Sequence, residues 1–163
     1  MNIKYPKIVK QRDNYIKRIM PFMRKNLVKV LTGHRRVGKS YILFQLMDLI
    51  CKDESEANII YINKEDITFD DIKTAKDLND FILSKSVTNK MNYIFVDEIQ
   101  EIPDFRLAIR SLALDENNDI YITGSNSEVF STDLANILGG RYMEFIIYSL
   151  SYLEFLDFMD LPN

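Results

Sequence analysis

The sequence lacks the features of a secreted or membrane protein. Its 163 residues include a single cysteine, Cys51, so no disulfide can form within the chain. A reducing, cytoplasmic setting is therefore the default expectation. No apolar stretch follows the N-terminal lysines, so no signal peptide is predicted, and no apolar run approaches membrane-spanning length. Cys51 ends an apolar segment, and we expect it to lie in the core.

The chain also lacks internal repeats and low-complexity segments. Hydrophobic residues make up 47% and charged residues 28% of it, which is ordinary for a soluble globular protein. At this length we expect one domain that can bury a sizeable core.

Acidic residues are nearly missing from the N-terminal quarter. Residues 1–40 hold 12 lysines and arginines but one acid, Asp13, whereas residues 41–163 hold 9 basic and 23 acidic residues. A basic arm could contact nucleic acid. However, apolar residues recur between the charges of residues 11–25, which favours a helix packed on the domain with its charged side solvated. We therefore expect residues 1–26 to form a basic helical segment against the core, and nucleic-acid binding stays unsupported.

A phosphate-binding loop is the most informative pattern present. The pattern G-x-x-x-x-G-K-S, typical of nucleotide triphosphatases, is matched by Gly33, His34, Arg35, Arg36, Val37, Gly38, Lys39 and Ser40. Apolar runs over residues 27–32 and 41–51 flank it and predict strand, loop and helix. Such a loop turns backbone N–H groups around a phosphate chain at the positive end of a helix. We predict that Lys39 reaches the β- and γ-phosphates, that Ser40 binds Mg²⁺, and that Tyr41 completes the nucleotide-binding residues.

A second motif consists of two acids, Asp97 and Glu98, after the apolar run of residues 93–96. A continuous apolar run is expected for a strand covered on both faces of a parallel sheet, and ligands lie at the carboxyl ends of such strands. Asp97 is therefore predicted to hold Mg²⁺ through water beside the phosphates. Glu98 is predicted to act as general base on the attacking water.

A third polar cluster follows the apolar strand expected over residues 119–123. The amide of Asn126 can both donate and accept hydrogen bonds, so we predict that Asn126 senses the γ-phosphate or the water, with Ser125 and Thr123 as alternatives. The same segment could cap the next helix, with Ser127 as N-cap. The two roles are compatible.

The order of the expected elements indicates an α/β fold. Strands are expected over residues 27–32, 59–62, 93–96, 120–123 and 142–147, and helices over 39–51, 74–85, 104–114, 127–137 and 151–159. This alternation predicts a parallel sheet with helices on both faces. In one large class of phosphate-loop proteins the carboxylates follow the third strand and a polar sensor the fourth. The expected fold is therefore the three-layer P-loop NTPase sandwich, with five strands in the order 5-1-4-3-2.

GTPases are a competing class, because Asn63, Lys64, Glu65 and Asp66 spell the guanine-reading pattern N-K-x-D. In GTPases this pattern follows the Mg²⁺ aspartate motif D-x-x-G. Here it precedes Asp97, and no D-x-x-G accompanies that aspartate. We interpret the four residues as the polar end of the second strand.

With these motifs, the chain resembles the AAA+ superfamily, and more narrowly a group of prokaryotic AAA-domain ATPases. The resemblance covers nearly the whole chain and is carried by residues 12–16, 33–40, 96–100, 122–127, 138–141 and 149–155. It implies ATP binding, Mg²⁺-dependent hydrolysis and activity that depends on oligomers. By its place after Gly139-Gly140, Arg141 matches an arginine finger that acts on a neighbour's ATP; the alternative is a surface arginine after a helix stop.

Some features depart from the group's pattern, which usually has proline where His34 and Ser149 stand. His34 is the chain's only histidine and occupies a variable loop position, so no catalytic role is expected for it. AAA+ proteins carry a helical lid after the core, and this group continues into a further C-terminal domain. We expect residues 27–163 to be the nucleotide-binding core alone, with the lid and the C-terminal domain absent.

Three functions are compatible with these motifs. The first is an ATPase that converts hydrolysis into conformational change on a partner, as a homo-oligomer in the full-length protein; Glu98 and Asn126 favour it. The second is a nucleotide-gated interaction module with little turnover. The third is a small-molecule kinase, but kinases of this fold usually carry arginine-bearing lid segments, and no clear one is present. No membrane partner is expected.

Overall fold

The computed structural model describes residues 10–125 and 133–162. The strands are β1 (Val28–Thr32), β2 (Asn58–Asn63), β3 (Asn92–Asp97), β4 (Asn118–Gly124) and β5 (Tyr142–Ile146). The helices are α1 (Asp13–Ile19), α2 (Lys39–Asp53), α3 (Ala75–Lys85), α4 (Phe105–Leu112), α6 (Asp133–Leu138) and α7 (Tyr152–Phe158). Short 3₁₀ turns are η1 (Met20–Phe22), η2 (Ile67–Phe69) and η3 (Ile99–Glu101).

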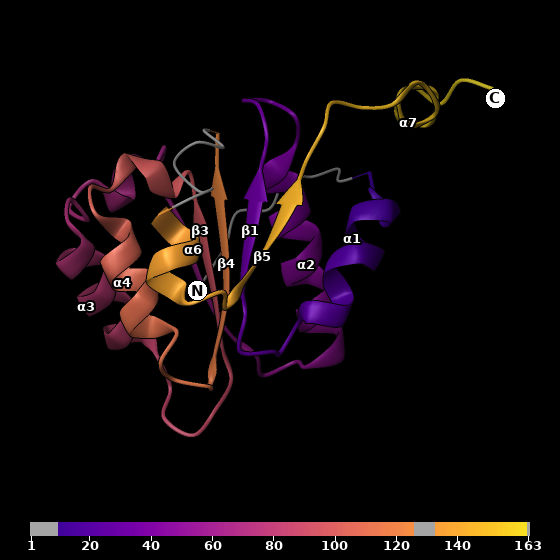
Figure 1. Cartoon of the computed structure of the whole chain (residues 1–163). Coiled ribbons are helices and arrows are strands. Elements are labelled where there is room, and N and C mark those ends of the chain that lie inside the picture. The colour runs from indigo at the N-terminus through magenta and orange to yellow at the C-terminus, as the bar shows by residue number, and fades with distance from the viewer. Residues whose placement is uncertain (1–9, 126–132, 163) are drawn as a thin grey trace.

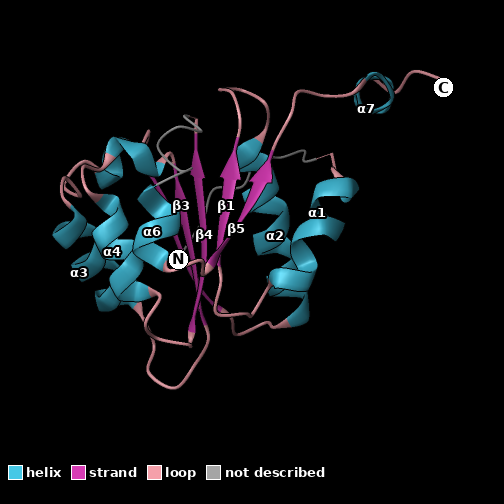
Figure 2. Ribbon diagram, viewed as in Figure 1, coloured by secondary structure: helices cyan, strands magenta, loops and turns pink. Residues whose placement is uncertain are grey.

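These strands form one sheet in which each neighbouring pair of strands is parallel (Figure 2). The spatial order is β2-β3-β4-β1-β5, which confirms the predicted order read from the other edge. β1 is therefore interior, with Val30 paired to Ile122 on one side and to Glu144 on the other. Because all the strands point the same way, their carboxyl ends meet at one edge of the sheet.

Helices cover both faces of the sheet, with α1 and α2 on one side and α3, α4 and α6 on the other (Figure 1). Successive side chains of a strand point to opposite faces. Val30 and Ile94 thus pack in the cluster under α3 and α4, while Leu31 and Phe95 pack in the cluster under α1 and α2. This explains why the strands read as continuous apolar runs.

The helices differ from the sequence expectation in two places. The N-terminal helix is shorter than residues 11–25, because α1 ends at Ile19 and Pro21 lies in the 3₁₀ turn that follows. The expectation that Cys51 lies in the core is wrong, since this residue is exposed. The inward face of α2 carries Met47 and Ile50, and Cys51 lies one position past that face, next to the exposed Lys52.

Among residues 10–125 and 133–162, no helix combines the length and the apolar character that a membrane span would need.

A buried ion pair joins the neighbouring strands β1 and β4 at their amino-terminal ends, away from the phosphate loop. Lys29 on β1 and Asp119 on β4 are 0% and 1% exposed and contact each other directly. Lys29 Nζ also donates to Leu27 O at 2.7 Å, while Asp119 Oδ2 accepts from the Tyr121 hydroxyl at 2.7 Å and from Arg24 N at 2.9 Å. Burial lowers the pKa of Lys29, against the opposing effect of Asp119. The buried charges of Lys29 and Asp119 thus have hydrogen-bond partners in place of the water that they lose.

Breaking this pair should destabilise the fold. Lys29→Met leaves the Asp119 carboxylate buried without its cation, so we expect the free energy of unfolding to fall by about 3–5 kcal/mol. Urea unfolding followed by circular dichroism measures this loss. The double variant Lys29→Met/Asp119→Asn should lose less than the two single variants together. Additive losses would contradict a coupled pair.

Candidate nucleotide-binding site

The phosphate loop joins the end of β1 to the start of α2, at the carboxyl edge of the sheet. Gly33, Arg36 and Gly38 have positive φ values of 142°, 65° and 97°, so the chain turns through left-handed conformations on its way to the helix. Glycine is required at the first of these positions, because a Cβ on Gly33 would lie 2.2 Å from Ile147 O. The backbone after β5 thus presses directly on the start of the loop.

Lys39 is the first residue of α2, and it is 3% exposed. Its ammonium donates to the carbonyls of Gly33 and His34, both at 3.1 Å, and lies 3.5 Å from Glu98 Oε1. An ammonium group forms charge-assisted hydrogen bonds with phosphate oxygens, and a phosphate can replace these carbonyls and the carboxylate as its acceptors. The structure therefore brings Lys39 and Glu98, which lie far apart in the sequence, into contact.

Asp97 is the last residue of β3, and it is 1% exposed. Burial raises the pKa of the Asp97 carboxyl, and hydrogen bonds from three hydroxyl side chains oppose this rise only in part. Those hydroxyls belong to Thr123, Ser40 and Tyr61. A carboxylate in contact with the Ser40 side chain lies where the sequence predicts the Mg²⁺ ligands to be.

Glu98 follows with a left-handed backbone conformation, φ 53° and ψ 48°. Such a conformation costs a non-glycine residue about 1–2 kcal/mol, and two contacts hold it here. Glu98 N donates to Thr123 Oγ1 at 2.9 Å, and Gln100 Nε2 donates to Glu98 Oε2 at 2.6 Å. The strained turn aims the carboxylate back along the sheet edge, toward Lys39.

Thr123 has a structural role that differs from the one considered for it in the sequence. Its hydroxyl donates to Asp97 Oδ1 and accepts from Glu98 N, so it is bound to β3 and does not face a phosphate. Because Val96 pairs with Ile122, the next residues of β3 and β4 are adjacent. Thr123 directly follows Ile122, just as Asp97 directly follows Val96. This matching position of a threonine and an aspartate at the ends of two paired strands could have identified the contact from the sequence.

A cavity of about 460 Å³ opens at this edge. It is lined by Arg35, Arg36, Gly38, Lys39, Ser40, Tyr41, Glu65 and Glu98. Most of the predicted nucleotide-binding residues therefore surround one space. Val37 is different, because its side chain is buried in the hydrophobic cluster under α1 and α2. Glu65, which follows β2, was not predicted; its place after a strand that ends at the same edge is the signal for it.

The N-K-x-D pattern after β2 is occupied by local contacts. Asn63 Oδ1 accepts from Glu65 N at 2.9 Å, and Asp66 Oδ1 accepts from Thr68 N at 2.9 Å. Lys64 Nζ donates to the carbonyls of two residues in and after η2. These contacts support the interpretation of the segment as the polar end of a strand.

Gly33, His34 and Asp97 do not line this cavity, although the first two bind Lys39 through their carbonyls and Asp97 contacts Ser40. Arg141 and Asn126 complete the predicted set. Arg141 is exposed and precedes β5, so it lies at the edge of the sheet opposite to the phosphate loop. Five strand residues at about 3.3 Å each separate the two edges by roughly 16 Å, which keeps Arg141 from the site of its own chain. Asn126 lies outside the described residues.

The donor set at the site is suited to Mg²⁺. Mg²⁺ is usually bound by one or two carboxylates together with phosphate oxygens and water, and here the Asp97 carboxylate contacts the Ser40 hydroxyl. In the described part of the chain, no group of three or more His, Cys, Asp or Glu side chains could hold a metal ion alone. A Mg²⁺ at this site would therefore rely on phosphate oxygens for its other ligands.

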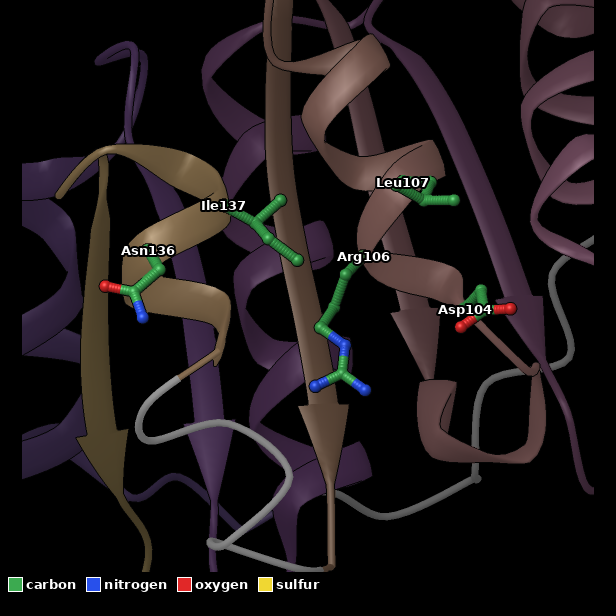
Figure 3. A pocket seen from close by; sticks show the side chains of 5 residues that line it. All are labelled: Asp104, Arg106, Leu107, Asn136 and Ile137. Carbon is green, nitrogen blue, oxygen red and sulfur yellow. The ribbon is translucent and has the colours of Figure 1, made fainter.

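A second, shallower hollow of about 310 Å³ lies between α4 and α6. Figure 3 shows the side chains that line it: Asp104, Arg106, Leu107, Asn136 and Ile137. None of the predicted site residues belongs to it.

Comparison with known proteins assigns the family. The family described as "AAA domain" matches residues 25–156. The chain belongs to this AAA-domain family. An uncharacterized protein of Haemophilus influenzae is 37% identical over 147 residues, which cover 89% of this chain and 37% of that protein. An uncharacterized protein of Methanocaldococcus jannaschii is 38% identical over 134 residues, which cover 82% of this chain and 29% of that protein. The chain thus spans about a third of the length of these relatives.

Solved structures share the fold of this AAA domain. The Aeropyrum pernix ORC1 protein in complex with DNA gives a TM-score of 0.65 at 11% identity, over 95% of this chain and 50% of that chain. PCH-2 of Caenorhabditis elegans gives 0.53 at 17% identity, over 79% and 36%. The shared fold confirms the predicted α/β P-loop fold, and the AAA-domain family confirms the AAA+ resemblance. Together they support a nucleotide-binding function of the ATPase type.

Removing the Thr123 hydroxyl should loosen the two acids without changing the size of the side chain. Thr123→Val leaves an oxygen of Asp97 and the backbone N–H of Glu98 without this partner. We expect the free energy of unfolding in urea to fall by about 1–3 kcal/mol. Thr123→Ser keeps the hydroxyl and serves as the control. Stability of Thr123→Val equal to that of the unchanged protein would show that the bridge contributes nothing.

Proposed function

We propose that this domain binds ATP with Mg²⁺ and hydrolyses it, and that hydrolysis drives a conformational change on a partner. The observation that carries the proposal is that Lys39 and Glu98 line one cavity at the carboxyl ends of β1 and β3, while the buried Asp97 contacts Ser40 in the wall of that cavity. These residues come from separate motifs, and each has the charge that its predicted role requires. Membership of the AAA-domain family supports the choice of ATP.

Binding and hydrolysis use different side chains in this proposal. Lys39 binds the β- and γ-phosphates, and phosphate oxygens replace its contacts with the loop carbonyls and with Glu98. Ser40 and Asp97 would hold Mg²⁺, which would supply positive charge to offset the negative charge of the phosphates. A water oxygen bonds to the γ-phosphorus, the bond to the β–γ bridging oxygen breaks, and Glu98 accepts the proton of the water.

Gln100 gives Glu98 a fixed orientation for this proton transfer. It holds Oε2 at 2.6 Å, while Oε1 is the oxygen nearest to Lys39. Proton transfer requires one oxygen to be free to approach the water, and that oxygen is Oε1. In this arrangement the lysine must exchange its partner before Glu98 can act.

A nucleotide-gated module with little turnover is the second candidate. The specific observation in its favour is that both oxygens of Glu98 have partners in the structure, Lys39 and Gln100. A base engaged in this way would hydrolyse ATP slowly. Turnover measured beside affinity separates the two candidates.

Nucleic acid is not proposed as the partner. The ORC1 protein with the same fold was solved with DNA, but its 11% identity carries only the fold. The excess of basic residues in the first 40 positions overstates the surface charge, because Arg12, Lys29 and Lys39 are buried. Lys29 pairs with Asp119 and Lys39 faces the cavity.

Lys39→Ala and Glu98→Gln should separate binding from hydrolysis. Lys39→Ala removes the cation of the loop, so we expect Mg²⁺-dependent ATP binding to be lost in calorimetry. Glu98→Gln keeps the size of the side chain but cannot accept the proton. We expect ATP affinity to persist and turnover to fall by about 10²–10⁴-fold, measured as phosphate release.

Matched controls use exposed residues away from the cavity. Lys52→Ala removes an exposed lysine from the last turn of α2, and Glu116→Gln changes an exposed acid in the turn before β4. Both should leave affinity and turnover unchanged. ATP affinity retained in Lys39→Ala would exclude this site as the nucleotide site, and equal loss of binding and turnover in Glu98→Gln would make Glu98 structural.

Arg141 is proposed to act on the ATP of a neighbouring subunit in a homo-oligomer. Arg141→Ala should then reduce turnover by about 10³-fold, and mixing it with Glu98→Gln protein should restore part of the turnover. In the mixture, an intact Arg141 of one subunit meets an intact Glu98 of another. Arg18→Ala, an exposed arginine on α1, is the control. An effect of Arg141→Ala in a proven monomer would overturn the role in trans.

A further inference from the structure

Arg12 is a buried arginine that lies behind the phosphate loop, outside the cavity. It is 3% exposed. Its guanidinium donates to Val37 O at 2.8 Å and to Tyr148 O from two nitrogens, each at 3.1 Å. It also makes a two-pronged pair with Glu154, Nε to Oε1 at 2.9 Å and Nη2 to Oε2 at 3.2 Å. One side chain therefore joins the phosphate loop to the segment after β5 and to α7.

Further contacts fix the position of this guanidinium. Arg12 N donates to Gln45 Oε1 at 2.9 Å, which ties the residue to α2. The guanidinium lies 4.5 Å from the centre of the Tyr15 ring, and the Tyr15 hydroxyl accepts from Tyr148 N at 3.0 Å. A planar group held by a ring on one face and by acceptors around its edge has a single orientation. Any shift of one partner therefore affects the others.

The helix α7 depends on polar contacts for its place. None of its residues is buried, and Figure 1 shows it standing apart from the sheet and from the other helices. Its capping box shares Glu154 with Arg12, because Ser151 N donates to Glu154 Oε2 at 2.8 Å. Lys10 adds contacts to Asp157 O and to Asp160. Polar bonds from the N-terminal segment, rather than a packed apolar face, thus hold α7 against the domain.

The carbonyl of Val37 belongs to the loop that binds phosphate in the proposed function. Gly38, the next residue, also lies close to Arg12: a Cβ there would be 3.7 Å from Arg12 Nη1. A change in this part of the loop alters the geometry of the Arg12 hydrogen bonds, and the pair with Glu154 shares the same rigid group. Charge-assisted, two-pronged pairs are sensitive to such changes in orientation.

We propose that Arg12 is a positioning residue that couples nucleotide binding at the phosphate loop to the docking of α7. This inference rests on the proposed function, because it requires that the loop binds ATP. When α7 is docked, Glu154 keeps the Arg12 guanidinium in the orientation in which it donates to Val37 O. When ATP is bound, the phosphate loop keeps Val37 O in the position in which it accepts from Arg12. Because coupling between two binding events is reciprocal, each should strengthen the other.

The decisive variant is Glu154→Gln, since Gln at this position can still complete the capping box but loses the charge that pairs with Arg12. We expect ATP affinity, measured by calorimetry with Mg²⁺, to fall at least about fivefold, although Glu154 does not line the cavity. Asp157→Asn is the control, because it removes the same charge from an exposed position of the same helix. Its affinity should equal that of the unchanged protein.

A second readout reports on α7 itself. Tyr152, Leu153 and Phe155 are exposed on this helix and are suitable sites for chymotrypsin. A non-hydrolysable ATP analogue with Mg²⁺ should slow cleavage within α7, and Glu154→Gln and Arg12→Lys should abolish this protection. Arg12→Lys keeps the charge but loses the planar fork. A residue with a purely structural role would lower the melting temperature without making cleavage of α7 depend on nucleotide.

The outcomes separate this inference from the proposed function. If the unchanged protein binds ATP and Lys39→Ala does not, the proposed function stands. Unchanged affinity and unchanged protection in Glu154→Gln would then overturn the coupling alone. If the unchanged protein shows no Mg²⁺-dependent ATP binding, the proposed function fails and the coupling fails with it.

Discussion

The parallel pairing of β1 with β4, and of β4 with β3, is the constraint on which the site depends. It puts the carboxyl ends of these three strands side by side, where Thr123 contacts Asp97 and Lys39 contacts Glu98. No local preference of the residues could create this meeting. The register matters equally, since a shift of one residue would turn Asp97 to the opposite face of the sheet. The site is therefore a consequence of strand order, and the loop supplies its phosphate-binding surface.

Buried polar links then hold the loop and the acids in place from behind. Thr123 fixes the turn at Glu98, and Arg12 supports the loop at Val37. Each of these groups is almost fully buried, where an unpaired donor or acceptor costs about 1–3 kcal/mol. The arrangement is consequently intolerant of partial changes. Charged side chains line the cavity, and they can exchange their present partners for phosphate oxygens. The polar groups of Thr123 and of the Arg12 guanidinium, which lie behind the cavity, already have hydrogen-bond partners.

The fold could be predicted well from the sequence, because short local patterns indicate its strands and its phosphate loop. Short apolar runs marked the strands, and the glycine loop and the acids after β3 fixed the class, from which the strand order followed. Cys51 was misplaced because an apolar composition does not say which face of a helix points inward. The role of Arg12 was not predictable, because its partner Glu154 lies far away in the chain. The contact of Thr123 with Asp97 could be identified only once the pairing of β3 with β4 was known. Counting charges also failed for Lys29, whose burial depends on a partner on another strand.

The place of β1 in the sheet has a consequence for how the protein is made. β1 ends at Thr32, whereas its neighbours β4 and β5 begin only at Asn118 and Tyr142. In contrast, β2, β3 and β4 pair in the order in which they are synthesised. At about 5–20 residues added per second, roughly 5–20 seconds separate the synthesis of β1 from that of β4. During that interval β1 is an unpaired apolar strand, open to chaperones and to misassociation. The phosphate loop that follows it can take its final shape only when the later strands arrive.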